Sequence, residues 1–72
     1  MRIVLLEDNL TQSTLVCAWL RNAGHDVHSF MLTRELQRFC NRESVDLYLL
    51  DWMMPDISGE EFLRWLRSER RD

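Results

Sequence analysis

Three acidic residues stand at positions where this chain could do chemistry. Glu7 and Asp8 directly follow the apolar run 3–6, and Asp51 directly follows the apolar run 47–50. Uninterrupted apolar runs of this kind are expected for short strands covered on both faces. Ligands of open α/β sheets bind beyond the carboxyl ends of the strands, so the three carboxylates are expected at a ligand-binding edge.

The expected chemistry is that of a divalent cation and a phosphoryl group. If the two strands are neighbours, three like charges meet, which is unfavourable unless a cation compensates them. Oxygen ligands without histidine or thiolate favour Mg²⁺, and a carboxylate beside a phosphate-binding metal can act as a nucleophile and form an aspartyl-phosphate. The alternative is that the three acids are solvated loop residues.

The segment after the second apolar run predicts a shaped loop and then a helix. Pro55 and Gly59 punctuate the loop, and Ser58 with Glu61 three residues later has the pattern of a capping box. Trp52 follows the candidate nucleophile directly, and it either borders the site or packs against the strand.

A helix after the first strand must help to position these acids. Asn9 is expected to cap it, with Gln12 making the reciprocal bond, and Gly24 is expected to end it. Cys17 lies off the apolar stripe of this helix. The stripe itself is expected to consist of Leu15, Val16, Trp19, Leu20 and Ala23.

One more strand and two more helices complete the pattern. Residues 27–30 predict a strand at a sheet edge, residues 33–41 a short helix, and residues 59–70 a last helix. The expected buried side chains are Leu36, Phe39 and Cys40 in the first of these helices and Phe62, Leu63 and Leu66 in the second. Strands that alternate with helices imply an α/β class with a parallel sheet, right-handed connections and helices on both faces.

Composition limits the remaining possibilities. The chain has 72 residues, which is at most one small domain, and its net charge of -3 argues against nucleic acid as the partner of this segment. No apolar run approaches the roughly 20 residues that span a bilayer, and no signal peptide is evident, so a cytoplasmic location without membrane contact is expected. Cys17 and Cys40 are expected on opposite faces of the sheet as reduced thiols.

Other residues with chemical potential have simpler interpretations. His25 and His28 lack a third metal ligand nearby in sequence, so turn and edge-strand surface is expected. Arginines near the carboxyl end of the last helix alternate with glutamates, which favours a solvated helix face over a nucleic-acid patch. These arginines are Arg64, Arg67, Arg70 and Arg71.

Taken together, these features make the chain similar to the amino-terminal part of a response-regulator receiver domain, the phospho-acceptor module of two-component signalling. The resemblance covers residues 2–70 and rests on the strand that ends in Glu7-Asp8 and on the pattern Asp51-x-x-Met54-Pro55-x-x-x-Gly59. It implies a flavodoxin-like three-layer α/β/α fold with strand order 2-1-3, truncated to about β-α-β-α-β-α. Residues 1–72 would form this one truncated domain, with no second domain in the chain.

The resemblance also implies a role for each site residue. Asp51 would accept the phosphoryl group and bind Mg²⁺ together with Asp8. The backbone carbonyl of Met53 would be a further ligand, and Glu7, where the family more often has aspartate, would hold the metal through water. Pro55 and Gly59 would shape the loop. The donor would be a sensor histidine kinase, a phosphotransfer protein or a small phosphodonor, and the chain would not itself be an enzyme.

The sequence departs from the family pattern in one large respect. A complete receiver continues through a fourth and a fifth strand, which carry a hydroxyl residue and a lysine, and this chain contains no lysine. Phosphorylation of the chain is therefore expected to be impaired. An unpaired third strand and an uncovered helix flank would favour a homodimer.

Two alternatives to the phospho-acceptor function remain open. The chain could be a receiver remnant that acts only in dimerisation or interaction. It could also be an aspartyl-phosphate phosphatase of the haloacid dehalogenase type, although that class usually has a second aspartate where this chain has Met53.

Overall fold

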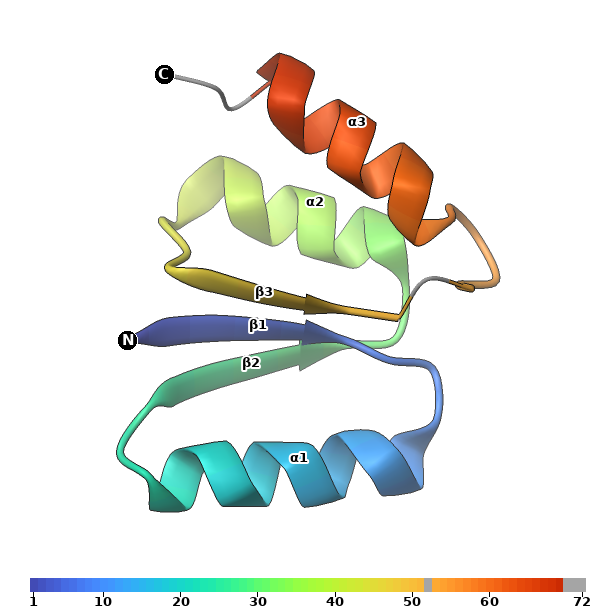
Figure 1. The fold of residues 1–72 in the computed structure, drawn as a ribbon. Coiled ribbons are helices and arrows are strands. Elements are labelled where there is room, and N and C mark those ends of the chain that lie inside the picture. The colour runs from blue at the N-terminus through green and yellow to red at the C-terminus, as the bar shows by residue number, and fades with distance from the viewer. Residues whose placement is uncertain (52, 70–72) are drawn as a thin grey trace.

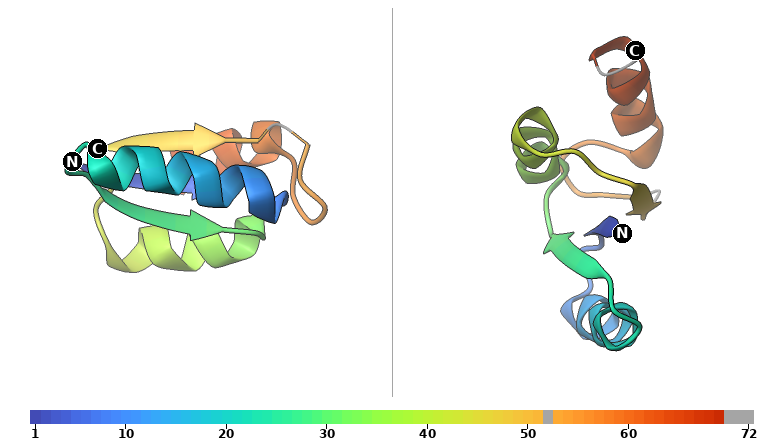
Figure 2. Two further views of the ribbon diagram at one scale, coloured as in Figure 1. Left: turned by 90° about the horizontal axis from the view of Figure 1, so that it is seen from below. Right: turned by 90° about the vertical axis from the view of Figure 1, so that its left-hand side faces the viewer.

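The protein folds as a small parallel sheet between helices, as the sequence predicts. A computed structural model describes residues 1–51 and 53–69. The elements are β1 (Arg2–Leu6), α1 (Leu10–Asn22), β2 (Asp26–Phe30), α2 (Thr33–Arg42), β3 (Leu47–Leu50) and α3 (Gly59–Glu69). Both strand pairs are parallel and the strand order is β2-β1-β3, which confirms the predicted flavodoxin-like order and the edge position of β2. Helix α1 covers one face, and α2 and α3 cover the other (Figures 1 and 2).

The strand register brings the carboxyl ends of all three strands level. Leu6 of β1 lies beside Phe30 of β2 and Leu50 of β3. Hydrogen bonds continue one step beyond the strands, because the Glu7 N–H donates to the Phe30 carbonyl at 3.1 Å and the Asp51 N–H donates to the Leu6 carbonyl at 2.9 Å. The first residue after β1 and the first after β3 are therefore fixed side by side.

Two apolar clusters hold the layers together. Val4 and Leu6 of β1 point towards α2 and α3, and the cluster on that side also contains Leu36, Phe39, Cys40 and Phe62. On the α1 side, the cluster consists of Ile3, Leu5, Val27 and Cys17. Cys17 and Cys40 are thus buried on opposite faces of the sheet, as expected, and no disulfide joins them.

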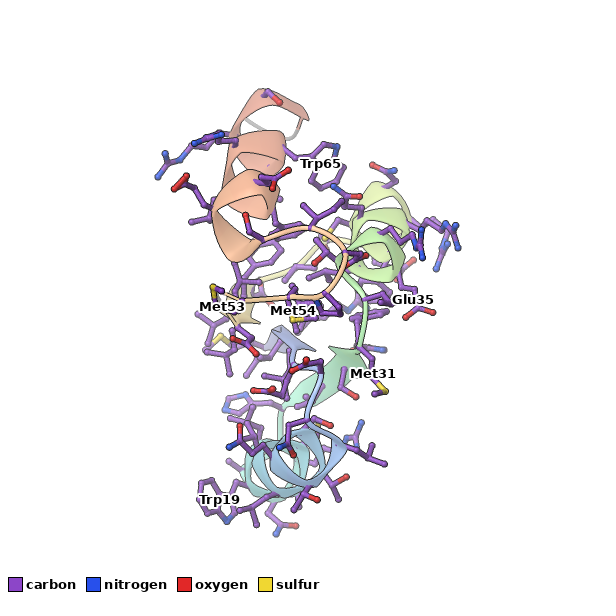
Figure 3. The ribbon with its side chains drawn as sticks, turned by 90° about the vertical axis from the view of Figure 1, so that its right-hand side faces the viewer. Trp19, Met31, Glu35, Met53, Met54 and Trp65 are labelled. Carbon is purple, nitrogen blue, oxygen red and sulfur yellow. The ribbon has the colours of Figure 1, made fainter. Side chains whose placement is uncertain are left out.

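The buried face of α1 differs from the predicted stripe. Ser13 and Cys17 are the buried residues of this helix, whereas Leu15 is 51% exposed and Trp19 is 64% exposed. The helix turns a narrow face of small side chains towards β1 and β2, and Val16 and Leu20 are only partly buried against it. The placement of Cys17 off the packed face was therefore wrong, and Trp19 points away from the sheet in Figure 3.

Strand β3 is less covered than its apolar sequence predicts. Leu47 is 38% exposed, and Tyr48, Leu49 and Leu50 are only half-buried. The reason is its position: β3 lies at an edge of the three-stranded sheet, and α1 packs mainly beneath β1 and β2. Tyr48 and Leu50 pack against the cluster on the α2–α3 side and Leu49 packs against the cluster on the α1 side, so the predicted covering of both faces is present but only partial.

Arg2 connects several segments at the amino-terminal end of the strands, opposite to the end that carries Glu7, Asp8 and Asp51. Its Nε and Nη1 atoms form ion pairs with Asp26 at 3.2 Å and with Glu43 at 3.1 Å. Its backbone N–H donates to Oδ2 of Asp46 at 2.7 Å. The two ends of the sheet thus differ in charge pattern, with acids paired to an arginine at one end and acids gathered together at the other.

Helix α3 begins with the predicted cap. The Ser58 Oγ accepts the Glu61 N–H at 3.2 Å. Phe62 is fully buried, and Leu66 packs partly buried against the cluster on the same side. The predicted helix end at Arg70 lies outside the described residues. No helix in residues 1–51 and 53–69 combines the length and the apolar character needed to cross a bilayer.

Candidate metal and phosphoryl-acceptor site

The carboxyl ends of β1 and β3 bring three carboxylates together. One oxygen from each of Glu7, Asp8 and Asp51 lies within 4.8 Å of the other two. Glu7 and Asp51 are half-buried, and Asp8 is exposed. The juxtaposition expected from the sequence is therefore present, and it follows from the parallel pairing of β1 with β3.

Local hydrogen bonds hold two of these carboxylates in their turns. Oε2 of Glu7 accepts the Asn9 N–H at 3.0 Å, and Oδ1 of Asn9 accepts the Gln12 N–H at 3.0 Å. Asn9 thus caps α1 as predicted. The backbone N–H of Asn9, however, donates to Glu7 and not to the predicted partner Gln12. Oδ1 of Asp51 accepts the Met53 N–H at 3.2 Å. Each of the two carboxylates has a second oxygen with which to bind a cation.

The arrangement is electrostatically costly without a cation. Two unit charges about 5 Å apart repel each other by about 1 kcal/mol in a water-like medium and by about 3 kcal/mol at the effective dielectric constant of a protein surface. Three carboxylates form three such pairs. A divalent cation replaces this repulsion by attraction, so the site is suited to one.

The donor set fits Mg²⁺. All three side chains offer hard oxygen atoms, which Mg²⁺ prefers over nitrogen or sulfur. One oxygen of each carboxylate lies within 4.8 Å of the other two, so the three side chains would be able to hold one cation between them, directly or through its waters.

The loop after β3 faces the same edge of the sheet. Figure 3 looks onto this edge, with Met53 and Met54 labelled on the loop. The Met53 side chain is 77% exposed, Pro55 is exposed, and Gly59 is buried at the start of α3. Trp52, which the sequence places next to the candidate nucleophile, lies outside the described residues.

The loop contains a further acid, Asp56, that was not identified from the sequence. Its Oδ1 accepts the Thr33 N–H at 3.0 Å and its Oδ2 accepts the Arg34 N–H at 3.1 Å, so it caps the start of α2. Partial burial raises the pKa of Asp56, but the backbone N–H donors outweigh this effect and hold the pKa below its ordinary value of 3.8. The only sequence signal was an acid in a Pro-containing loop, which gives no sign of a cap 23 residues away.

Comparisons with known proteins agree with this fold. The family described as "Response regulator receiver domain" matches residues 3–72. A receiver protein from Pseudomonas putida, solved by crystallography, superimposes with a TM-score of 0.89 at 20% identity over 97% of this chain and 59% of that chain. The parallel order 2-1-3 and the helices on both faces define a flavodoxin-like α/β domain. The chain belongs to the response regulator receiver domain family.

Curated relatives include transcriptional regulators. The regulatory protein VanRc of Enterococcus gallinarum is 33% identical over 67 residues, which are 93% of this chain and 29% of that protein. The phosphate regulon transcriptional regulatory protein PhoB of Rhizobium meliloti is 33% identical over 93% of this chain and 30% of its own length. The chain thus spans less than a third of these relatives. Membership places it among signalling domains.

Proposed function

We propose that this chain is a phospho-acceptor module whose Asp51 is phosphorylated in a Mg²⁺-dependent reaction. The single observation that carries the proposal is the meeting of three carboxylates within 4.8 Å at the carboxyl ends of β1 and β3. A carboxylate oxygen of Asp51 attacks the phosphorus atom of the donor, and the bond from phosphorus to the leaving group breaks as the new P–O bond forms. Bound Mg²⁺ supplies charge compensation for the phosphoryl oxygens.

Each neighbouring residue has a distinct role in this proposal. Asp8 and Asp51 bind the cation directly, and the backbone carbonyl of Met53 is a third protein ligand. Glu7 would hold the cation through water, as the family resemblance implies, while its Oε2 accepts the Asn9 N–H. Pro55 and Gly59 shape the loop. The site therefore needs no histidine or thiolate ligand.

The same proposal covers the setting of the module. A histidine kinase or a phosphotransfer protein donates the phosphoryl group, and the chain accepts it without acting as an enzyme on other substrates. Residues 1–72 belong to one receiver domain, which lies in the cytoplasm and does not bind nucleic acid through this segment. The chain contains no lysine, so no lysine of this segment assists the transfer, and slow phosphorylation is expected.

A second candidate function is interaction through apolar surface. Leu10, Leu15 and Trp19 of α1 are 65%, 51% and 64% exposed, and Leu47 on the edge strand β3 is 38% exposed. Exposed apolar residues that gather on one helix are typical of surfaces that bind another chain. Under this alternative the chain forms a homodimer through the α1 flank or the β3 edge and is not phosphorylated.

The test is incubation with Mg²⁺ and acetyl phosphate, read by intact mass. We expect the mass of one phosphoryl group on the chain, no gain in Asp51→Asn, and no gain after chelation of the metal. Asp46→Asn is a matched control, because Asp46 is an acid at the opposite end of the sheet and should leave the gain unchanged. A folded chain that gains no phosphoryl group would favour the interaction function instead.

A further inference from the structure

The start of helix α2 depends on a residue from another part of the chain. The position before Thr33 is Leu32, whose side chain makes no cap hydrogen bond. A leucine side chain cannot accept hydrogen bonds from the unpaired N–H groups in the first turn of a helix. Leucine is therefore among the least favourable residues at the N-cap position. Asp56 from the loop after β3 takes over this role, with one carboxylate oxygen on each of two successive N–H groups.

A second bond joins the same two segments. The Thr33 hydroxyl donates to the Ile57 carbonyl at 2.8 Å, and Thr33 is fully buried. The loop and the start of α2 are therefore connected by three hydrogen bonds from adjacent residues on each side. We call this set of contacts, made by Asp56 and Ile57 with Thr33 and Arg34, the clasp.

The loop is attached to the acidic site at its other end. The Met53 N–H donates to Oδ1 of Asp51 at 3.2 Å. Only Met54 and Pro55 separate this attachment from the clasp. Met54 packs against the apolar cluster beneath α2 and α3, and the ring of Pro55 fixes its φ angle. Because the connection is this short and contains a packed and a rigid residue, we expect a displacement at one end to reach the other.

We infer that the clasp is a positioning device for the acidic site, which links cation binding beside Asp51 to the order of the first turn of α2. This inference rests on the proposed function, because it concerns the same cation. The clasp fixes the loop that carries the Met53 backbone, and cation binding in turn stabilises the loop that caps α2. Coupling between two sites is reciprocal, so each effect requires the other.

The first experiment measures the Mg²⁺ dissociation constant of the chain and of three variants by calorimetric titration. Asp56→Ala removes both caps, Asp56→Asn keeps one acceptor oxygen, and Thr33→Val removes only the hydroxyl bond at nearly constant volume. We expect affinity to fall on the order of threefold to tenfold for Asp56→Ala, below the range seen when direct partners of metal ligands are removed, and by less for the two milder variants. Asp46→Ala removes a comparable carboxylate bond at the far edge and should leave the affinity unchanged.

The second experiment reads the reciprocal effect without using phosphorylation. Amide hydrogen exchange of the first turn of α2 is measured with and without Mg²⁺. We expect Mg²⁺ to slow exchange at the Thr33 and Arg34 amides in the unmodified chain. In Thr33→Val, where Asp56 remains, we expect this protection to be smaller, and in Asp56→Ala we expect Mg²⁺ to have no effect on the turn. A purely structural cap would lower protection in the variants equally with and without the cation.

The outcomes separate the inference from the function on which it rests. If the unmodified chain binds no Mg²⁺ at millimolar concentration, the proposed function fails and the inference fails with it. If the chain binds Mg²⁺ and the folded variants bind it with the same affinity, the clasp does not position the site, and the proposed function stands. Asp56→Asn and Thr33→Val remain decisive if Asp56→Ala does not fold.

Discussion

Glu7 shows how one residue can serve two purposes at the site. Its carboxylate accepts the Asn9 N–H at the start of α1, and it also adds a negative charge to Asp8 and Asp51. The hydrogen bond requires only an acceptor oxygen, whereas cation binding benefits from the charge. A substitution that keeps the oxygen and removes the charge therefore separates the two purposes.

Glu7→Gln is expected to stabilise the metal-free chain and to weaken Mg²⁺ binding. Removing one of three clustered charges should raise the free energy of unfolding without Mg²⁺ by on the order of 1 kcal/mol, because two repulsive pairs disappear. Urea unfolding with and without Mg²⁺ measures both effects, since binding to the folded state raises stability. Glu60→Gln, an exposed acid of α3, is the control: loss of its ion pair with Arg64 should lower stability slightly, and equally with and without Mg²⁺. Equal stabilisation of Glu7→Gln and the unmodified chain by Mg²⁺ would exclude Glu7 from the site.

At the scale of elements, register explains why the candidate site could be predicted. Glu7 and Asp51 each follow a run of apolar residues directly, so parallel pairing of the two strands was enough to bring the acids together. The Asp56 cap could not be predicted, because Thr33 and Asp56 are joined by the fold and not by a local pattern. The buried side of α1 was predicted correctly for Val16 and Leu20 and wrongly for Leu15 and Trp19, for a similar reason. Hydrophobicity alone favoured Leu15 and Trp19, but the face that meets the sheet is the one with small side chains, Ser13 and Cys17.

The cap of α2 predicts a pH dependence of stability. The pKa of Asp56 is lower in the folded chain than its ordinary value of 3.8, so the folded state favours the ionised form. The stability that this preference provides is present above pH 3.8 and is lost as the pH falls through the lower, folded pKa. Above that range, Asp56→Ala should cost about 1 kcal/mol, as loss of a helix cap typically does.

Chemical unfolding of the chain and of Asp56→Ala at a series of pH values measures this effect. The difference in unfolding free energy between the two should be constant near neutral pH and should shrink below pH 3.8. All other residues are the same in the two proteins, so the difference reports on Asp56. A difference that does not change with pH would show that the carboxylate charge is not part of the cap.

At the scale of the whole molecule, the two faces of the sheet are unequally covered. Two helices pack on one face, where Phe62, Leu36 and Val4 are completely buried. A single helix packs on the other, and its outer apolar side chains are exposed. The strand pattern predicted the layers correctly, but the exposure of α1 and β3 depends on which elements lie beside them, and the described residues supply none there.

This unequal covering predicts that the chain self-associates at high concentration. Light scattering should give a mass above that of the 8.7 kDa monomer, because apolar surface on α1 and the open edge of β3 is removed from water in a dimer. Leu15→Glu should restore the monomer if α1 forms the interface, and Leu47→Lys should do so if the β3 edge forms it. Met31→Glu, at a residue that is 47% exposed and distant in sequence from both surfaces, is the control for added charge. A monomer at every concentration would contradict both interfaces and would also remove the main support for the interaction function, leaving the acidic edge as the feature on which function depends.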